Sequence, residues 1–192
     1  MKRSTKYNAA LIAVSALFAA LLVGGKEALA VLPNIEVVTL LIALCAYVWG
    51  PIVVFPAVNV FIAVDMAIWG VNTWIISYFI HWNCVAVAFW LLGKAKFRHR
   101  AVEVVCVTAL ALVMTTLFGV LTSAVDTLVG FIGGKGFFVD FDNFFARFAV
   151  MYLNGTSFYV TQIVCNLVLF AVAFVPLEIV NRKAKLRIAI DK

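Results

Sequence analysis

Apolar residues fill the chain in long runs, and short polar stretches separate these runs. A run of about twenty apolar residues can cross the ~30 Å hydrocarbon core of a bilayer as an α-helix. A helix also satisfies its own backbone hydrogen bonds in lipid. The pattern therefore predicts an all-α fold, a polytopic membrane bundle that forms one domain over residues 1–192. The six expected transmembrane helices cover residues 7–27, 36–50, 52–70, 73–92, 102–130 and 150–178.

The second and third expected helices come from one apolar run, Val37 to Gly70. Its 34 residues would make a single helix of about 51 Å at ~1.5 Å per residue, too long for the bilayer core. Gly50-Pro51 is the expected break, because proline cannot continue the helical hydrogen-bond ladder and restricts the residue before it. The segment before the break is short, so we expect it to be tilted or partly covered by its neighbours.

Charge fixes the expected orientation. The chain is 66% hydrophobic and 12% charged, against about 25% charged residues in soluble domains, so we expect a multi-pass protein of the cell membrane. Both termini are predicted to be cytoplasmic, because twelve of the fifteen basic residues then lie on the cytoplasmic side, as the positive-inside rule requires. These twelve are Lys2, Arg3, Lys6, Lys94, Lys96, Arg98, Arg100, Arg182, Lys183, Lys185, Arg187 and Lys192. Such clusters indicate contacts with lipid headgroups rather than nucleic acid.

The first thirty residues also have the basic start, apolar middle and Ala28-Leu29-Ala30 end of a cleavable signal peptide. Lys26 and Glu27 lie inside the would-be cleavage region, which favours a retained first helix. A ridge of small residues runs along one face of this helix, at Ala9, Ala13, Ala16 and Ala20. Small side chains let helices approach closely in lipid. The ridge predicts either a contact within the bundle or a docking face for a separate membrane subunit.

Polar side chains within the spans collect in the half expected to face outward, and burial of such groups in lipid is costly unless they are paired or line a cavity. Helical spacing places several of them in stripes on the third, fourth and sixth helices. These stripes are Asp65, Trp69 and Asn72; Trp74, Tyr78, His81 and Trp82; and Tyr159, Gln162 and Asn166. The pattern predicts a cup open to one side, suited to a small, flat ligand with polar edges. Its aromatic residues are also typical of an interfacial belt.

The stretch KEALAVLPNIEVV, from Lys26 to Val38, is expected to form the rim and lid of this cup. Asp65, Asp126 and Glu103 are expected either to pair with Lys26 or to bond to hydroxyl groups. The loop from Gly130 to Arg147 alternates aromatic and acidic residues, which favours either a second lid or a segment that lies on the membrane.

The sequence contains no catalytic signature. His81 has only His99, in a basic loop, as a second histidine, and the four cysteines stand singly within spans. There is no HExxH, GxSxG or P-loop motif. We therefore expect neither an enzyme, nor a metal site, nor a bound cofactor, and any active transport would take its energy from a partner.

The stretches KEALAVLPNIEVVTLLIALCAYVWG and MAIWGVNTWIISYFIHW, together with six short-looped helices and an alanine-ridged first helix, resemble an S-component of an energy-coupling factor (ECF) transporter. The resemblance implies a membrane subunit that captures a vitamin from outside. It also implies docking through Ala9, Ala13, Ala16 and Ala20 onto a transmembrane coupling protein attached to two ATPases. The family's lid would be residues 30–36. The implied substrate-binding residues are Asn34, Trp74, Tyr78, His81, Asp126, Tyr159 and Gln162.

The identity of the vitamin stays open among cobalamin, vitamin B6 compounds, and pyrimidine or folate precursors. Two other classes remain. A self-sufficient secondary transporter would show internal repeats and a polar midplane, and neither is evident. A membrane scaffold without a small-molecule ligand would depend on the alanine ridge and tolerate changes at Tyr78, His81 or Gln162.

Overall fold

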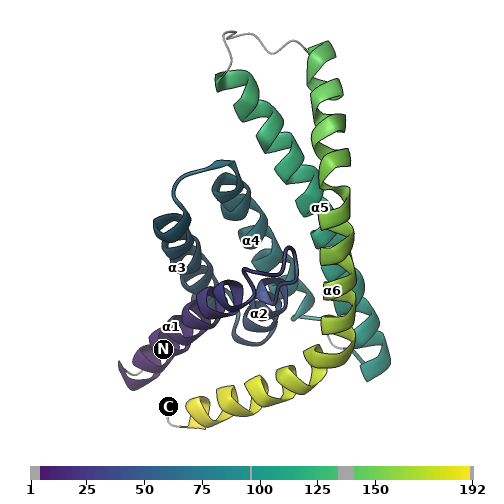
Figure 1. Ribbon diagram of the computed structural model, residues 1–192. Helices are drawn as coiled ribbons and strands as arrows, with labels where there is room; N and C mark the ends of the chain where they lie inside the picture. Colours follow the sequence, from purple (N-terminus) through teal and green to yellow (C-terminus); the bar gives the residue numbers. More distant parts are fainter. Residues whose placement is uncertain (1–4, 96, 134–140, 191–192) are drawn as a thin grey trace.

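The computed structural model describes residues 5–95, 97–133 and 141–190, and these form helices without any strand (Figure 1). The all-α prediction is confirmed for this part of the chain. The helices are α1 (Thr5–Ala28), α2 (Val38–Leu44), the π-helical η1 (Cys45–Trp49), α3 (Pro51–Trp69), α4 (Thr73–Leu92), α5 (Arg100–Gly133) and α6 (Phe141–Ile190).

Five helices, α1, α3, α4, α5 and α6, are long and apolar enough to cross a membrane. In their most apolar windows only 22% to 39% of the residues are buried within the protein, so most of the apolar side chains face outward. An outward apolar surface of this extent is compatible with an integral membrane protein.

The expected span at residues 36–50 differs from these five helices in its length and its burial. α2 and η1 together form one continuous helix of seven plus five residues, about 18 Å long at ~1.5 Å per residue. Nearly all of its side chains are buried between the other helices. The prediction of a short segment covered by its neighbours is therefore confirmed, while its membrane crossing is not tested.

The break at Gly50-Pro51 is also confirmed. Gly50 has a φ of 82°, a conformation that favours glycine, and Pro51 begins α3. The Gly50 N–H donates to the carbonyl oxygens of Cys45 and Ala46, at 3.3 and 3.1 Å, which closes the π-helical turn. The chain therefore reverses directly from η1 into α3.

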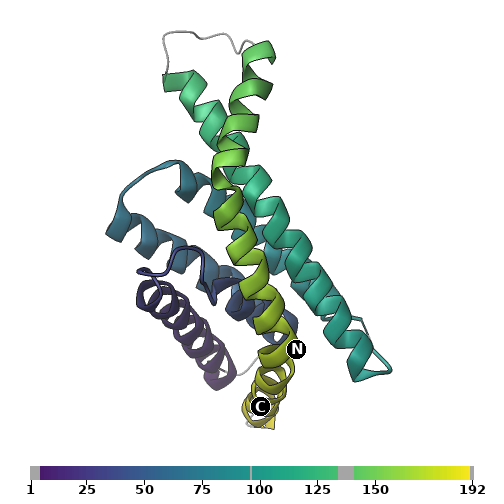
Figure 2. The same cartoon turned by 45° about the vertical axis from the view of Figure 1, so that its right-hand side comes forward.

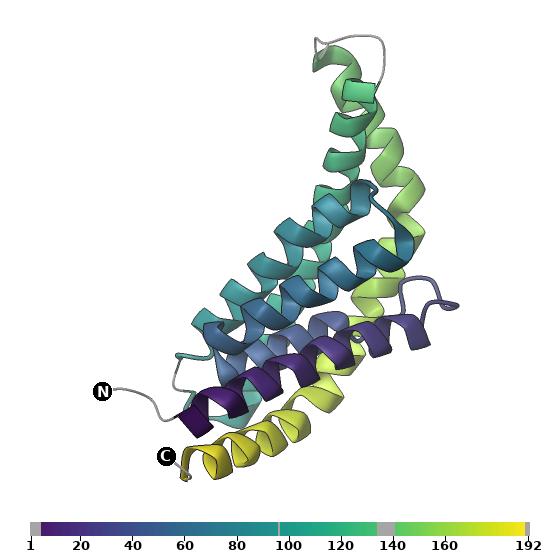
Figure 3. The same ribbon diagram turned by 90° about the vertical axis from the view of Figure 1, so that its left-hand side faces the viewer.

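The helices are arranged around α2 and η1. The long helices α5 and α6 run side by side as an antiparallel pair that reaches beyond α3 and α4 (Figure 2). α1 packs on α3, α3 on α4, and α4 on α5, which closes the bundle (Figure 3). The centre is filled by fully buried side chains that include Ile42, Val58, Phe61, Phe89 and Phe170.

α5 and α6 are longer than predicted. Their 34 and 50 residues correspond to about 51 and 75 Å at ~1.5 Å per residue. α5 extends to Gly133 and α6 begins at Phe141 rather than residue 150, so residues 130–133 and 141–147 of the predicted second lid are helical. Residues 134–140 lie outside the described part, as do Lys2, Arg3, Lys96, Lys135 and Lys192.

α6 bends in the region of its internal Pro176, and the following segment runs back toward the start of α1 (Figure 1). Hydropathy placed the end of the span at residue 178, but the helix continues to Ile190 as a basic segment. The start of α1 and the end of α6 consequently lie at the same end of the molecule (Figure 3).

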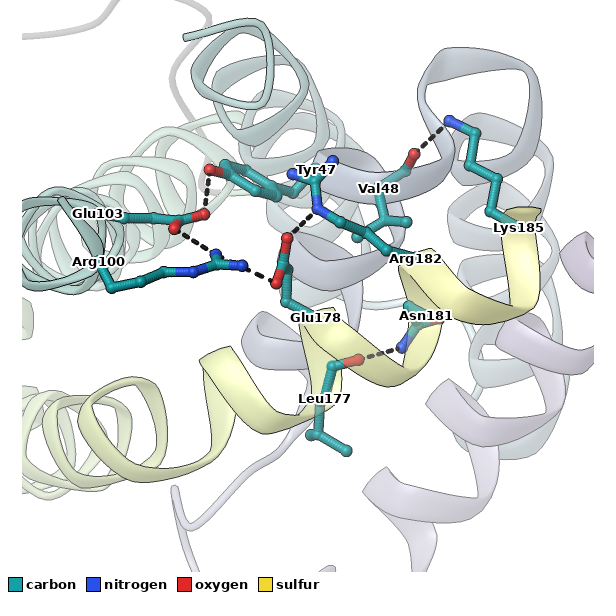
Figure 4. Close-up of polar contacts among 9 residues, drawn as sticks. All are labelled: Tyr47, Val48, Arg100, Glu103, Leu177, Glu178, Asn181, Arg182 and Lys185. Carbon is teal, nitrogen blue, oxygen red and sulfur yellow. Dashed lines mark hydrogen bonds and ion pairs between the residues drawn. The ribbon is translucent and has the colours of Figure 1, made fainter. Parts of the chain in front are cut away.

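A polar cluster around the buried carboxylates of Glu103 and Glu178 ties this end together (Figure 4). Fully buried Glu178 accepts hydrogen bonds from Arg182 and, at 3.4 Å, from Arg100. Arg100 also binds Glu103 at 2.5 Å, and Glu103 accepts a hydrogen bond of 2.7 Å from the Tyr47 hydroxyl. Of the two alternatives expected for Glu103, the structure therefore shows the bond to a hydroxyl group and not the pairing with Lys26, because the fold places Glu103 at the opposite end of the bundle.

Candidate ligand-binding site

A cavity of about 550 Å³ lies at the other end of the bundle, beneath the loop between α1 and α2. The loop and the adjoining parts of all six α-helices contribute its walls, so segments far apart in sequence meet there. The residues that line it are Lys26, Leu29, Ala30, Leu32, Pro33, Asn34, Ile35, Glu36, Val38, Phe61, Trp69, Trp74, Tyr78, Trp82, Phe118, Thr122, Asp126, Gly155, Phe158, Tyr159 and Gln162.

Helical periodicity explains this lining. α4 contributes Trp74, Tyr78 and Trp82, spaced by four residues, and α5 contributes Phe118, Thr122 and Asp126 with the same spacing. Residues three or four apart share one face of a helix. α6 adds Gly155, Phe158, Tyr159 and Gln162 by the same rule. Each helix therefore presents one continuous stripe to the cavity.

Lys26, in the last turn of α1, forms an ion pair with Asp65 of α3. The pairing of Lys26 with Asp65 is thus confirmed. The ammonium also lies 5.6, 5.8 and 5.6 Å from the ring centres of Trp69, Trp74 and Tyr78, which is within the range of cation–π attraction. Asp65 is only 2% exposed, so the ammonium offsets the cost of burying that carboxylate.

A second polar contact holds the other end of the loop. The Glu36 carboxylate accepts hydrogen bonds from the Thr39 N–H at 2.8 Å and the Thr39 hydroxyl at 2.5 Å. The Asn166 amide of α6 donates to the same carboxylate at 2.9 Å and to the Thr115 hydroxyl at 3.0 Å. The loop is therefore fixed at Lys26 to α3 and at Glu36 to α6.

Between these two anchors, the loop turns over the cavity. Asn34 has a φ of 58°, a left-handed conformation that asparagine tolerates better than most residues. Pro33 precedes it and pre-sets its own φ for a turn. Pro33, Asn34 and most of their neighbours line the cavity, so the stretch at residues 30–36 borders this space, and its role as a lid stays a prediction.

Aromatic rings form the inner wall. The Tyr78 ring lies 5.6 Å from that of Trp82 and 5.9 Å from that of Phe118, and the Trp82 and Phe118 rings lie 5.8 Å apart. Ring pairs at these separations attract each other. The wall is therefore a connected set of rings rather than isolated interfacial residues.

Tyr159 occupies a slot between α5 and α6. Its hydroxyl lies 3.0 Å from that of Ser123 and 3.3 Å from that of Thr122. A Cβ atom at Gly119 would lie 2.9 Å from the Tyr159 ring, and one at Gly155 would lie 2.5 Å from its hydroxyl oxygen. The two glycines consequently make room for this ring.

Comparison with protein-family models, with curated proteins and with solved structures finds no match for the chain.

The structure brings together six of the seven predicted binding residues, since Asn34, Trp74, Tyr78, Asp126, Tyr159 and Gln162 all line the cavity. The seventh, His81, does not line it. Its ring lies 4.7 Å from both the Trp82 and the Phe118 rings, and His81 is 3% exposed. It lies behind the aromatic wall because its position on α4 faces α5 instead.

Some lining residues were not among the predicted set. Phe118 and Thr122 lie eight and four residues before Asp126 on the same face of α5, and this spacing could have identified them. Asn72, by contrast, was predicted to belong to the stripe of α3 but does not line the cavity. It caps α4, accepting a hydrogen bond of 3.2 Å from the Ile75 N–H, and does not continue the stripe of α3, which ends at Trp69.

Two polar groups of the cavity lack a partner in the described part of the chain. The Oε1 atom of Gln162 has no hydrogen-bond partner there, although Gln162 is only 3% exposed. Asp126 is half-buried and makes no ion pair or hydrogen bond with any described residue. Within the described residues, no three His, Cys, Asp or Glu side chains are grouped so that they could hold a metal ion.

The alanine ridge lies on the outside of the molecule. Ala9, Ala13, Ala16 and Ala20 are all exposed. The buried face of α1 consists instead of Leu11, Ser15, Phe18, Ala19 and Leu22. The ridge therefore does not serve as a contact within the bundle.

Proposed function

We propose that the chain is the substrate-capture subunit of an ECF-type importer, which binds a vitamin or related micronutrient from outside. The observation that carries this proposal is the cavity, because a loop, an aromatic wall and a few polar groups converge on one space. Cavities of this kind, at about 300–1,000 Å³, are typical of small-molecule sites. The role is binding and delivery, without chemical change of the ligand.

The cavity lies at one end of the bundle, which supports capture from one side rather than a complete pathway. Its polar groups come from the loop at residues 29–36, from the last turn of α1, and from the faces of α4, α5 and α6 that adjoin the loop. A self-sufficient secondary transporter would place its site near the midplane between repeats. Delivery in this proposal therefore depends on a transmembrane coupling protein driven by two ATPases.

The proposed topology has six crossings in the cell membrane, of which α2–η1 is the short one, and both termini are cytoplasmic. The distribution of basic side chains supports it. Of the ten Lys and Arg residues in the described part, only Lys26 and Arg147 belong to the end with the cavity. The other eight are Lys6, Lys94, Arg98, Arg100, Arg182, Lys183, Lys185 and Arg187.

The exposed ridge on α1 supports docking of the coupling protein. Ala9, Ala13, Ala16 and Ala20 leave a shallow surface that another helix can approach closely, and close approach is the main source of helix association in lipid. The ridge lies away from the residues that line the cavity, so one surface can serve the partner while the other serves the ligand.

Among the candidate vitamins, the size of the cavity favours a ligand of one or two rings. A volume of about 550 Å³ suits a drug-sized molecule, whereas cobalamin, a macrocycle with an attached nucleotide, is much larger. Vitamin B6 compounds and pyrimidine or folate precursors have planar rings that match the aromatic wall.

Native mass spectrometry of the detergent-purified chain tests the proposal. We expect a co-purified small molecule at one copy per chain, with a mass that identifies it. The matched control is the Trp74→Ala/Tyr78→Ala double variant, which removes two lining rings and should lose the bound mass. A chain that carries no ligand, and whose melting temperature does not change across a panel of vitamins, would instead favour the scaffold function.

A further inference from the structure

We propose that the ligand is a small aromatic compound with a positively charged group, such as a protonated amine, and that Asp126 forms the ion pair with it. This inference rests on the proposed function and adds to it the charge of the substrate and the residue that selects for that charge.

The first argument is the balance of charge around the cavity. Lys26 is the one basic side chain among the lining residues, and its ammonium is committed to Asp65. Glu36 lines the cavity, but Thr39 and Asn166 already satisfy its carboxylate. Asp126 is the remaining lining carboxylate, and it makes no ion pair or hydrogen bond within the described residues. The cavity lining therefore has an excess of negative charge at Glu36 and Asp126, and of these two carboxylates only Asp126 lacks a partner within the described residues.

The second argument is the surroundings of Asp126. It lies one helical turn beyond Thr122 and two beyond Phe118 on the face of α5 that lines the cavity. Thr122 contacts the Tyr159 hydroxyl at 3.3 Å, so aromatic side chains of α5 and α6 line the same cavity as the carboxylate. Aromatic faces attract cations through their quadrupole. A cationic ring compound would thus meet a carboxylate and π-faces together.

The third argument is that this wall already holds a cation. The Lys26 ammonium lies within 5.8 Å of three ring centres, those of Trp69, Trp74 and Tyr78. These rings attract positive charge, and because Asp65 neutralises the Lys26 ammonium, that ammonium repels a second cation less than an unpaired lysine would. Lys26 lines the cavity and is paired with Asp65 of α3, whereas Asp126 on α5 lines the cavity without a partner among the described residues and can pair with a charge on the ligand.

The fourth argument is the buried amide of Gln162. Gln162 lines the same cavity, is 3% exposed, and its Oε1 acceptor has no partner within the described residues. A buried acceptor without a donor is unfavourable, and an ammonium or amino group supplies N–H donors. A carboxylate or phosphate would supply acceptors only, would face Asp126, and would find Lys26 already paired.

Three probes with the same ring and different charge test the inference: benzylamine, benzyl alcohol and benzoate. The full chain is reconstituted in lipid nanodiscs, and binding is titrated by ligand-observed saturation-transfer NMR, with empty nanodiscs as the blank. We expect benzylamine to bind at least about tenfold more tightly than benzyl alcohol, because a charge-assisted hydrogen bond contributes this much. Benzoate should bind most weakly.

Two variants test whether Asp126 causes the preference for benzylamine. Asp126→Asn keeps the shape of the side chain and should reduce benzylamine binding to the level of benzyl alcohol, with benzyl alcohol unchanged. Glu27→Gln removes the same charge from a residue near the mouth that does not line the cavity. It should leave the preference for benzylamine intact, which separates a specific ion pair from a general effect of net charge.

The inference is overturned if benzoate binds as tightly as benzylamine, if Asp126→Asn leaves benzylamine binding unchanged, or if none of the three probes binds. The native mass spectrum separates this failure from failure of the proposed function. A stoichiometric anionic compound would overturn the cationic ligand and leave capture standing, whereas a chain that binds no small molecule at all would overturn both.

Discussion

The side-chain nitrogen of Asn166 lies 2.9 Å from the Glu36 carboxylate, although 130 residues separate the two in sequence. The same nitrogen lies 3.0 Å from the Thr115 hydroxyl. A single buried amide on α6 therefore joins the lid loop to α5 and α6. The position of the loop over the cavity depends on this contact and on the Lys26–Asp65 pair at its other end.

Replacement Asn166→Leu keeps the volume of the side chain but removes the donor to Glu36. We expect the free energy of unfolding to fall by about 1–3 kcal/mol, because a partly buried carboxylate loses a hydrogen bond. Thermal unfolding in detergent, followed by circular dichroism, measures the change. Asn154→Leu, at an exposed position of the same helix, is the control and should have little effect. Equal stability of the two variants would contradict the role of Asn166.

The Lys26–Asp65 ion pair predicts that a variant lacking only the lysine is less stable than a variant lacking both charges. Lys26→Met leaves a carboxylate that is 2% exposed without its cation, which should cost about 3 kcal/mol. Lys26→Met/Asp65→Asn removes both charges and should recover more than half of that loss. Unfolding by titration with sodium dodecyl sulfate measures the stabilities. Additive losses in the double variant would show that the two side chains act independently.

The close contact between Gly119 and the Tyr159 ring predicts that a larger residue at position 119 lowers the stability of the protein. A Cβ atom in Gly119→Ala would lie 2.9 Å from the Tyr159 ring, and overpacking of this kind costs about 1–3 kcal/mol. The displaced ring would also weaken ligand binding. Gly24→Ala is the matched control, because Gly24 is helical with no atom within 4 Å of the added carbon. It should stabilise α1 by about 0.5–1 kcal/mol. If both variants bind ligand equally well, the slot does not shape the cavity.

The polar cluster around Glu178, at the end of the bundle opposite the cavity, predicts that Glu178→Gln is destabilising (Figure 4). The substitution leaves Arg100 and Arg182 without their shared carboxylate. Loss of one partner of a buried ion pair costs about 3–5 kcal/mol, and the half-exposed arginines reduce this to about 2 kcal/mol. Thermal unfolding measures the effect, with Lys183→Gln on the exposed side of the same segment as the control. Ligand affinity should not change, because Glu178 lies far from the cavity lining.

The helices and most of the cavity could be predicted from the sequence for a physical reason. In an apolar chain each polar or aromatic side chain is conspicuous, and helical periodicity assigns it to a face. Trp74 and Tyr78, or Tyr159 and Gln162, could therefore be grouped without knowledge of the fold. The Gly50-Pro51 break could be predicted because it depends on local backbone chemistry.

Other features depend on contacts that periodicity does not define. His81 lies at the edge of the α4 stripe, and the approach of Phe118 decides that it lies behind the wall. Asn72 lies outside α3 because Gly70, with a φ of 78°, ends that helix first. The end of α6 was placed at residue 178 because its basic continuation lowers the hydropathy, although basic residues do not end a helix.

The exposed alanine ridge gives the prediction that separates ligand capture from delivery. Ala16→Trp adds a large side chain on the outside of α1, away from the cavity. Ligand binding by the purified chain should be unchanged. Co-purification with the coupling protein, and uptake of the ligand by cells that contain the full transporter, should fall at least about tenfold, because a clash at a close helix contact costs more than 1.4 kcal/mol. Ala63→Trp, at an exposed alanine of α3, is the control and should preserve uptake.

Equal loss of ligand binding and uptake in Ala16→Trp would mean that the ridge supports the fold of the binding site rather than a partner. Normal uptake would mean that another surface carries the coupling protein.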